Sequence, residues 1–141
     1  IMTAEFPLAV HALVYLMHTA RVTTSEELAD NICTNPARVR LVMSKLAHAR
    51  LVEATRGKGS GYLFTGTEST SLKEILDALG EQPVAVNWHS GDIDRDCLVS
   101  SGMGAVMDEL YGTLNERCRQ ELQQVTIAAI NQKIFGRKKE E

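Results

Sequence analysis

Apolar residues near the N-terminus recur with the spacing of an α-helix. The stripe consists of Phe6, Ala9, Val10, Leu13, Leu16 and Met17. Positions that follow i, i+4, i+7 and i+11 lie on one helical face, so the pattern predicts a buried helix over residues 6–20. This segment is too short to cross a bilayer, and Glu5 stands where a signal peptide would carry basic residues. We therefore expect no membrane partner.

The next apolar stretches predict two helices joined by a tight turn. Thr24 followed by Glu27 has the spacing of a capping box, and Leu28, Ala29 and Ile32 face inward. Asn35 is a good N-cap and Pro36 suits the first helical position. The second helix buries the stripe Val39, Val42, Met43 and Leu46. Cys33 lies in the turn, where we expect a small core residue.

A short hairpin is predicted after this pair of helices. Residues 51–55 and 62–65 have the character of strands, and the glycine-rich basic segment 56–61 turns one into the other. Helix, turn, helix and hairpin together are the arrangement of a winged helix-turn-helix, in which the second helix enters the DNA major groove. The hairpin, or wing, then touches the DNA backbone or minor groove.

The C-terminal half is predicted to contain a short capped helix and one long helix. Ser71 and Glu74 mark the start of the short helix, and Gly80 ends it. From Ser101 apolar residues recur in steps of three and four, and Ile127, Ile130 and Ile134 suggest a last short helix. The dimer interface that we predict consists of Met103, Met107, Leu110, Leu114, Cys118 and Leu122. An ordinary core helix is the alternative.

Charge is distributed unevenly along the chain. The whole protein carries a net charge of −3, whereas residues 35–60 hold six Lys and Arg residues against the single acid Glu53. Residues 67–141 hold eight bases and thirteen acids. Such asymmetry gives one face that attracts phosphate, although a solvated basic helix would have the same composition. The helix–hairpin context favours DNA.

Composition and motifs exclude several other classes of protein. The 141 residues, 44% of them hydrophobic, suffice for one compact domain, with or without an appended helix. The three cysteines form no C-x-x-C pair and imply no disulfide framework, so we expect a cytoplasmic protein. We find no phosphate loop, metal-ligand spacing or nucleophile elbow. We expect neither an enzyme nor a catalytic residue.

The segment TSEELADNICTNPARVRLVMSKLAHARLVEATRGKGSGYLF resembles the N-terminal half of the Rrf-two family of bacterial regulators. The family pattern covers the remainder of the chain at lower fidelity. The resemblance implies homodimers, joined by an extended helix, that bind palindromic operators. It also implies that Asn35, Ala37, Arg38 and Arg40 face bases or phosphates and that Arg56 reaches the minor groove. The DNA-contact set that we predict is Ser25, Asn35, Ala37, Arg38, Arg40, Lys45, Arg56, Gly57, Lys58 and Tyr62.

The resemblance also draws attention to residues 81–100, where cluster-bearing members of the family supply three cysteines. Here only Cys97 is present, and Ser100 stands where a histidine would. Because a [2Fe–2S] cluster normally needs four protein ligands, we expect no cluster, no metal and no other cofactor. Cys97 is instead a candidate redox sensor or an inert residue; Arg95 or the following helix would lower the thiol pKa, and the acids at 92, 94 and 96 oppose them. Trp88 and His89 either line a small-molecule pocket or plug the core.

The sequence therefore predicts an α+β, mostly helical protein: a winged helix-turn-helix with a long C-terminal dimerisation helix. Residues 2–80 would form the DNA-binding domain, 81–100 a sensor-like loop, and 101–135 the dimerisation helix and C-terminal segment. The predicted function is a transcriptional repressor that binds a near-palindromic operator in double-stranded DNA as a homodimer, with an unknown small-molecule or protein effector. A protein-interaction module, or a thiol sensor acting through a protein partner, is the alternative.

Overall fold

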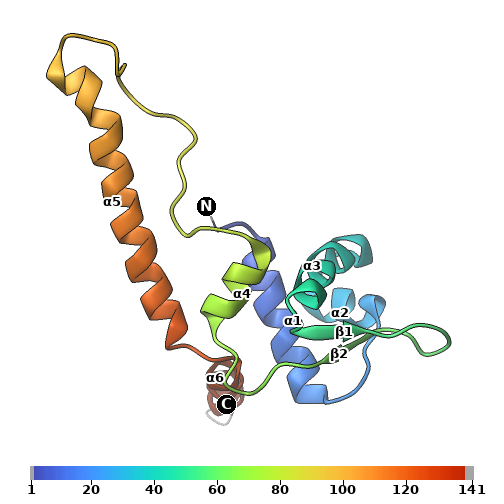
Figure 1. Cartoon of the computed structure of the whole chain (residues 1–141). Coiled ribbons are helices and arrows are strands. Elements are labelled where there is room, and N and C mark those ends of the chain that lie inside the picture. The colour runs from blue at the N-terminus through green and yellow to red at the C-terminus, as the bar shows by residue number, and fades with distance from the viewer. Residues whose placement is uncertain (1, 139–141) are drawn as a thin grey trace.

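The computed structural model describes residues 2–138 and contains mostly helices (Figure 1). Its elements are α1 (Glu5–Thr19), α2 (Ser25–Ile32), α3 (Pro36–His48), β1 (Val52–Ala54), β2 (Tyr62–Phe64), α4 (Leu72–Leu79), α5 (Leu98–Gln123) and α6 (Ile127–Lys138). This order confirms the predicted fold class, including the long C-terminal helix. No helix in the described part of the chain is both long and apolar enough to span a bilayer.

Helix starts follow the predicted capping residues, with one difference. Asn35 accepts a 2.8 Å hydrogen bond from the Arg38 amide at the start of α3, and Ser71 and Glu74 form a full capping box on α4. Thr24 caps α2 through the Glu27 amide, but the Glu27 carboxylate does not return to Thr24. It binds Arg21 and Tyr15 instead, so the predicted capping box is only half formed. The Arg21 guanidinium, and then the Tyr15 hydroxyl, lower the pKa of Glu27.

One hydrophobic core holds the first four helices, the hairpin and the start of α6 together. Helix α1 contributes the most to it, burying Leu8, Ala9, Ala12, Leu13, Val14 and Leu16. The predicted stripe of α3 is fully enclosed, and Ile127 inserts into the same core from α6. Burial of this apolar surface is the main favourable contribution to folding.

The turn between α2 and α3 is tight and is made by Cys33. This residue has a left-handed backbone conformation, with φ 66°, and its thiol is exposed. The prediction that Cys33 is a small core residue is therefore wrong. Helices commonly end with one residue of positive φ, and Cys33 takes this C-cap position at the surface rather than a position on the buried face of α2.

The wing is an antiparallel hairpin whose register pairs Val52 with Phe64 and Ala54 with Tyr62. Its second strand also bridges to Thr23, the residue before the cap of α2, through two backbone hydrogen bonds. A Cβ atom at Gly61 would collide with the Thr23 carbonyl oxygen. Glycine at this position therefore lets the hairpin lie against the helix-turn-helix and fixes the direction of the wing.

Helix α5 extends away from the domain formed by α1–α4 (Figure 1). The segment 81–97 leads from α4 out to the far end of α5, and the helix then returns toward the domain. The helix begins at Leu98, three residues before the predicted start, so that Cys97 is its N-cap. At the other end a β-bridge between Ser71 and Thr126 joins the α5–α6 junction to the start of α4. Helix α6 then packs against α1.

Candidate nucleic-acid interface

The outward face of α3 is neutral at its centre. The residues opposite the buried stripe are Ala37, Leu41, Ser44 and His48, and all four are exposed. Leu41 is 67% exposed although every other large apolar side chain of this helix is buried. Ala37, Leu41 and Ser44 thus present small or apolar side chains, spaced by four and three residues, on a helix whose width a major groove admits.

Cations flank this neutral face on both sides. Arg40 turns toward α2, where its Nη1 atom lies 3.1 Å from Ser25 Oγ and 3.6 Å from a Glu26 carboxylate oxygen. Lys45 turns toward α1 and pairs with Glu5 at 3.2 Å. Arg38 is exposed and makes no salt bridge within residues 2–138. Exposed pairs of this kind contribute about 0–1 kcal/mol, so the side chains of Arg40 and Lys45 can exchange their carboxylate partners for phosphates.

The wing tip presents two further cations. Arg56 and Lys58 are exposed and, among the described residues, form no salt bridge. Gly57 and Gly59 have φ values of 88° and 78°, which a side chain would disfavour. The tip loop is closed by a 2.8 Å hydrogen bond from the Thr55 amide to the Gly61 carbonyl. Both cations are therefore carried on a short, defined turn.

Three residues of the predicted contact set have roles within the protein itself. Ser25 is buried and holds Arg40, and the Asn35 side-chain oxygen caps α3. Tyr62 is half-buried against the core; desolvation raises the pKa of its hydroxyl, and nearby Glu26 adds to that shift while Arg40 opposes it. Ser25 and Tyr62 therefore serve the internal structure of this surface, whereas Arg38, Arg40, Arg56 and Lys58 have exposed side chains.

The predicted dimer stripe divides over two sides of α5. Met107, Cys118 and Leu122 are half-buried on the side that faces the chain's own segment 81–90 and α4. That side is held by two hydrogen bonds between Val84 and Asn115 and by the His89–Asp108 pair at 2.7 Å. The other side is exposed and apolar, and we call it the free face of α5. It comprises Val99, Val106, Leu110 and Leu114, with Met103 at its edge beside Trp88 and His89.

Several residues of these surfaces are absent from the predicted sets, among them Leu41 and Val106. Leu41 could have been found, since it falls out of step with the buried stripe of α3 and so must face outward. Val106 was part of the apolar repeat, but only the return of segment 81–90 along α5 shows that it lies on the free face, 62% exposed.

Cys97 is exposed at the N-cap of α5. The backbone amides of Ser100, and then of Val99, lower the pKa of its thiol, which is the direction that favours the reactive thiolate. Trp88 and His89 line a shallow groove of about 260 Å³ against Met103 and Met107. Trp88 is 75% exposed, so the prediction that it could plug the core is wrong.

The donor atoms do not fit an iron–sulfur cluster. Cys33 lies in the α2–α3 turn, Cys97 at the start of α5, and Cys118 farther along that helix. Within the described residues, no three His, Cys, Asp or Glu side chains come close enough together to hold a metal ion. A cluster needs about four ligands, which these side chains do not bring together.

Comparison with known proteins identifies the family. The sequence model of the Rrf2 family, described as iron-dependent transcriptional regulators, matches residues 2–133. YwnA of Bacillus subtilis (strain 168), named as an HTH-type transcriptional regulator, is 24% identical over 132 residues, covering 94% of this chain and 98% of that protein.

Solved structures share the fold. A protein from Lactobacillus plantarum named as a transcriptional regulator superposes with a TM-score of 0.82 at 22% identity, over 95% of this chain and 91% of that chain. CymR, the global cysteine regulator of B. subtilis, superposes with a TM-score of 0.67 at 17% identity, over 93% and 95% of the two chains. Because the family match extends over nearly the whole length, the chain belongs to the Rrf2 (Rrf-two) family of transcriptional regulators.

Proposed function

We propose that this protein is a transcriptional repressor that binds a near-palindromic operator as a homodimer. The observation that carries the proposal is the surface formed by α3 and the wing, where a neutral helix face is bordered by Arg38, Arg40 and Lys45 and extended by Arg56 and Lys58. In this proposal Ala37, Leu41 and Ser44 meet base edges in the major groove. The flanking cations contact phosphates, and Arg56 enters the adjacent minor groove.

The free face of α5 supports the homodimer. Its apolar side chains, with Met103 at the edge, follow a spacing of three and four residues, which suits packing against a second helix. Pairing two copies along this face would present two α3 helices to one duplex. Successive major grooves are about 34 Å apart, so a two-fold dimer reads two inverted half-sites.

Repression needs no further machinery in this chain, because an operator-bound dimer can block a promoter by occupying it. We also propose a cytoplasmic location, which the family membership and the three unpaired cysteines support. The proposed activity does not involve iron, because the described His, Cys, Asp and Glu side chains form no group that could hold a metal ion.

The first test is selection of binding fragments from the source genome, followed by affinity measurements against salt. Proteins that neutralise several phosphates lose affinity steeply as salt rises. We therefore expect the logarithm of the binding constant to fall steeply with the logarithm of the salt concentration. Arg56→Ala should lower operator affinity about tenfold, or about 1.4 kcal/mol, because one charged contact is lost. Arg95→Ala, an exposed arginine in the segment 81–97, is the matched control and should change nothing. Unchanged affinity in Arg56→Ala would refute the wing assignment.

Cys97 supports a second candidate role, that of a thiol that adjusts the regulator to oxidising conditions. It is exposed, its pKa is lowered, and it lies at the start of the proposed dimerisation helix. A modification there would alter the first turn of α5 and the apolar residues Leu98 and Val99 beside it. Genomic selection with and without oxidant tests this role, and identical fragments at identical affinity would refute it.

A winged helix can also serve as a protein-interaction module. The exposed cations on α3 and the wing favour DNA over this alternative, because a protein-binding surface has no need of them. The two alternatives differ in their salt response: a complex with a protein partner that is insensitive to salt, together with no retention on heparin, would favour the module.

A further inference from the structure

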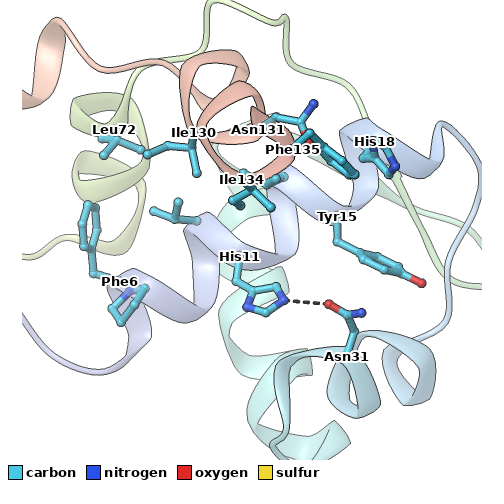
Figure 2. Close-up of a pocket in the computed structure, with 13 residues that line it drawn as sticks. Phe6, His11, Tyr15, His18, Asn31, Leu72, Ile130, Asn131, Ile134 and Phe135 are labelled. Carbon is cyan, nitrogen blue, oxygen red and sulfur yellow. Dashed lines mark hydrogen bonds between the residues drawn. The ribbon is translucent and has the colours of Figure 1, made fainter. Parts of the chain in front are cut away.

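A groove of about 610 Å³ lies between α1 and α6 (Figure 2), and the described residues that line it include none of α3 or the wing. Its walls are apolar, with Val10 and Val14 on α1 facing Ile130 and Ile134 on α6. This volume falls within the range of about 300–1,000 Å³ that small-molecule sites occupy. Ile134 remains 52% exposed beside the groove, so the side chains that the structure describes leave the space open.

Aromatic rings line the groove at both ends. His18 on α1 and Phe135 on α6 stack with their ring centroids 4.4 Å apart and their planes 24° apart. Phe6 and Tyr15 also border the space, each from α1 (Figure 2). Flat side chains of this kind favour a planar aromatic guest over a flexible chain, because aromatic pairs contribute about 0.5–1.5 kcal/mol beyond burial.

Hydrogen-bond acceptors lie along one edge. His11 Nε2 lies 2.7 Å from the side-chain oxygen of Asn31, an acceptor on a residue that also lines the groove (Figure 2). The Tyr15 hydroxyl donates to Glu27 at 2.7 Å and keeps its own lone pairs. A guest would therefore be recognised by an N–H or O–H group that it donates.

The described residues that line the groove include no Asp, Glu, Lys or Arg. A charged guest would lose its hydration without gaining an ionic partner, and this desolvation is costly. We propose that the groove binds a neutral aromatic molecule carrying one hydrogen-bond donor.

A molecule bound there would contact the DNA-binding unit directly. Asn31 belongs to α2, the first helix of the helix-turn-helix, and it is tied to the groove through His11. The opposite wall belongs to α6, which directly follows α5. Binding would thus set the position of α2 relative to α5 and change operator affinity; this consequence, unlike binding itself, rests on the proposed function.

The test uses N-phenyl-1-naphthylamine, a neutral aromatic amine whose fluorescence rises in apolar surroundings, added to the full-length protein without DNA. We expect saturable binding of one molecule per chain. The comparison probe, 8-anilino-1-naphthalenesulfonate, has the same ring skeleton and an added sulfonate. It should bind at least tenfold more weakly, and equal or tighter binding of it would overturn the neutral class of ligand.

Two variants place the binding in the groove. Ile134→Trp fills the space and should weaken binding at least tenfold, whereas Ile93→Trp, the same change at an exposed loop position, should leave it unchanged. Phe135→Ala removes one wall at a second exposed position and should also weaken binding, which keeps the test decisive if Ile134→Trp unfolds. Absence of binding to the wild-type protein would overturn the proposal, as would binding that survives both groove variants.

A last measurement separates the two proposals. The amine is added to the protein bound to its selected operator, and we expect the operator affinity to shift. A protein that binds no DNA fragment would refute the proposed function and leave the result for the groove standing.

Discussion

The domain formed by α1–α4 and the helix α5 differ in how much they bury. Helix α1 encloses six of its side chains in the core, whereas none of the 26 residues of α5 is buried. The first region has completed its packing within one chain. The second has an apolar face that the described residues leave exposed, while its other side is held by polar contacts and by half-buried residues such as Leu122. The difference supports the proposal that folding and dimerisation would depend on separate sets of apolar residues.

The largest effect should come from the completed core. Leu46→Ala removes a fully buried side chain of α3 and should lower the free energy of unfolding by about 2–5 kcal/mol. Leu41→Ala, the same change in the same helix at an exposed position, should alter it by no more than about 0.5 kcal/mol. Urea unfolding at one protein concentration measures both. Equal losses in the two variants would mean that α3 is oriented differently.

Assembly is broken by a charge on the free face. Leu110→Asp should give a folded monomer, because a carboxylate cannot be buried against a second apolar helix. Loss of paired binding should lower operator affinity by about 10²–10⁴. Light scattering and fluorescence anisotropy report the two results. Ala105→Asp places the same charge on another side of α5 and should remain dimeric, and a dimeric Leu110→Asp protein would refute the free face as the interface.

A smaller effect distinguishes base reading from phosphate contact. Leu41→Ala should weaken binding to the selected operator about fivefold, or about 1 kcal/mol, through loss of apolar contact with a base. Affinity for unrelated DNA should stay the same, since phosphate contacts dominate it. Competition binding with the selected operator and with unrelated DNA measures the ratio of the two affinities. An equal loss on both would exclude a role for Leu41 in specificity.

The smallest effect concerns Cys97. Because backbone amides lower its pKa, more of it is thiolate at neutral pH than for an ordinary thiol, and it should react with iodoacetamide a few times faster than glutathione. The alkylation rate of Cys97 should fall as the pH decreases through its lowered pKa. The alkylation rate of glutathione should fall in the same way but at a higher pH. Mass spectrometry of the alkylated peptide follows the reaction. A rate profile that matches glutathione would remove the basis for a sensor.

Local signals explain why much of the fold could be predicted. Caps such as Asn35 and Ser71 act through amides within three residues, so their sequence neighbours suffice to identify them. The stripe of α3 and the hairpin register likewise depend on short-range spacing. The half-formed box at Thr24 was mispredicted because Arg21 and Tyr15 compete for the Glu27 carboxylate, and Tyr15 reaches it from another helix.

The candidate sites depend more on long-range contacts. The partners of Arg40 and Lys45 are acids on α2 and α1, and sequence spacing does not reveal them. The apolar repeat of α5 covers both of its sides, and only the path of segment 81–90 shows which side is free. The groove between α1 and α6 joins segments more than a hundred positions apart, so no local motif could have predicted it.

The bridge between Ser71 and Thr126 fixes the C-terminal end of α5, so that the helix can tilt about this point. At 1.5 Å per residue the 26-residue helix is a lever about 39 Å long, so a tilt of about 10° at the bridge moves its tip by roughly 7 Å. In the proposed dimer, joined along the two α5 helices, a slight rotation near α4 and α6 would therefore change the distance between the two DNA-binding domains by several ångströms. Under the proposed function, such a rotation would lower operator affinity without any change in the packing of the hydrophobic core.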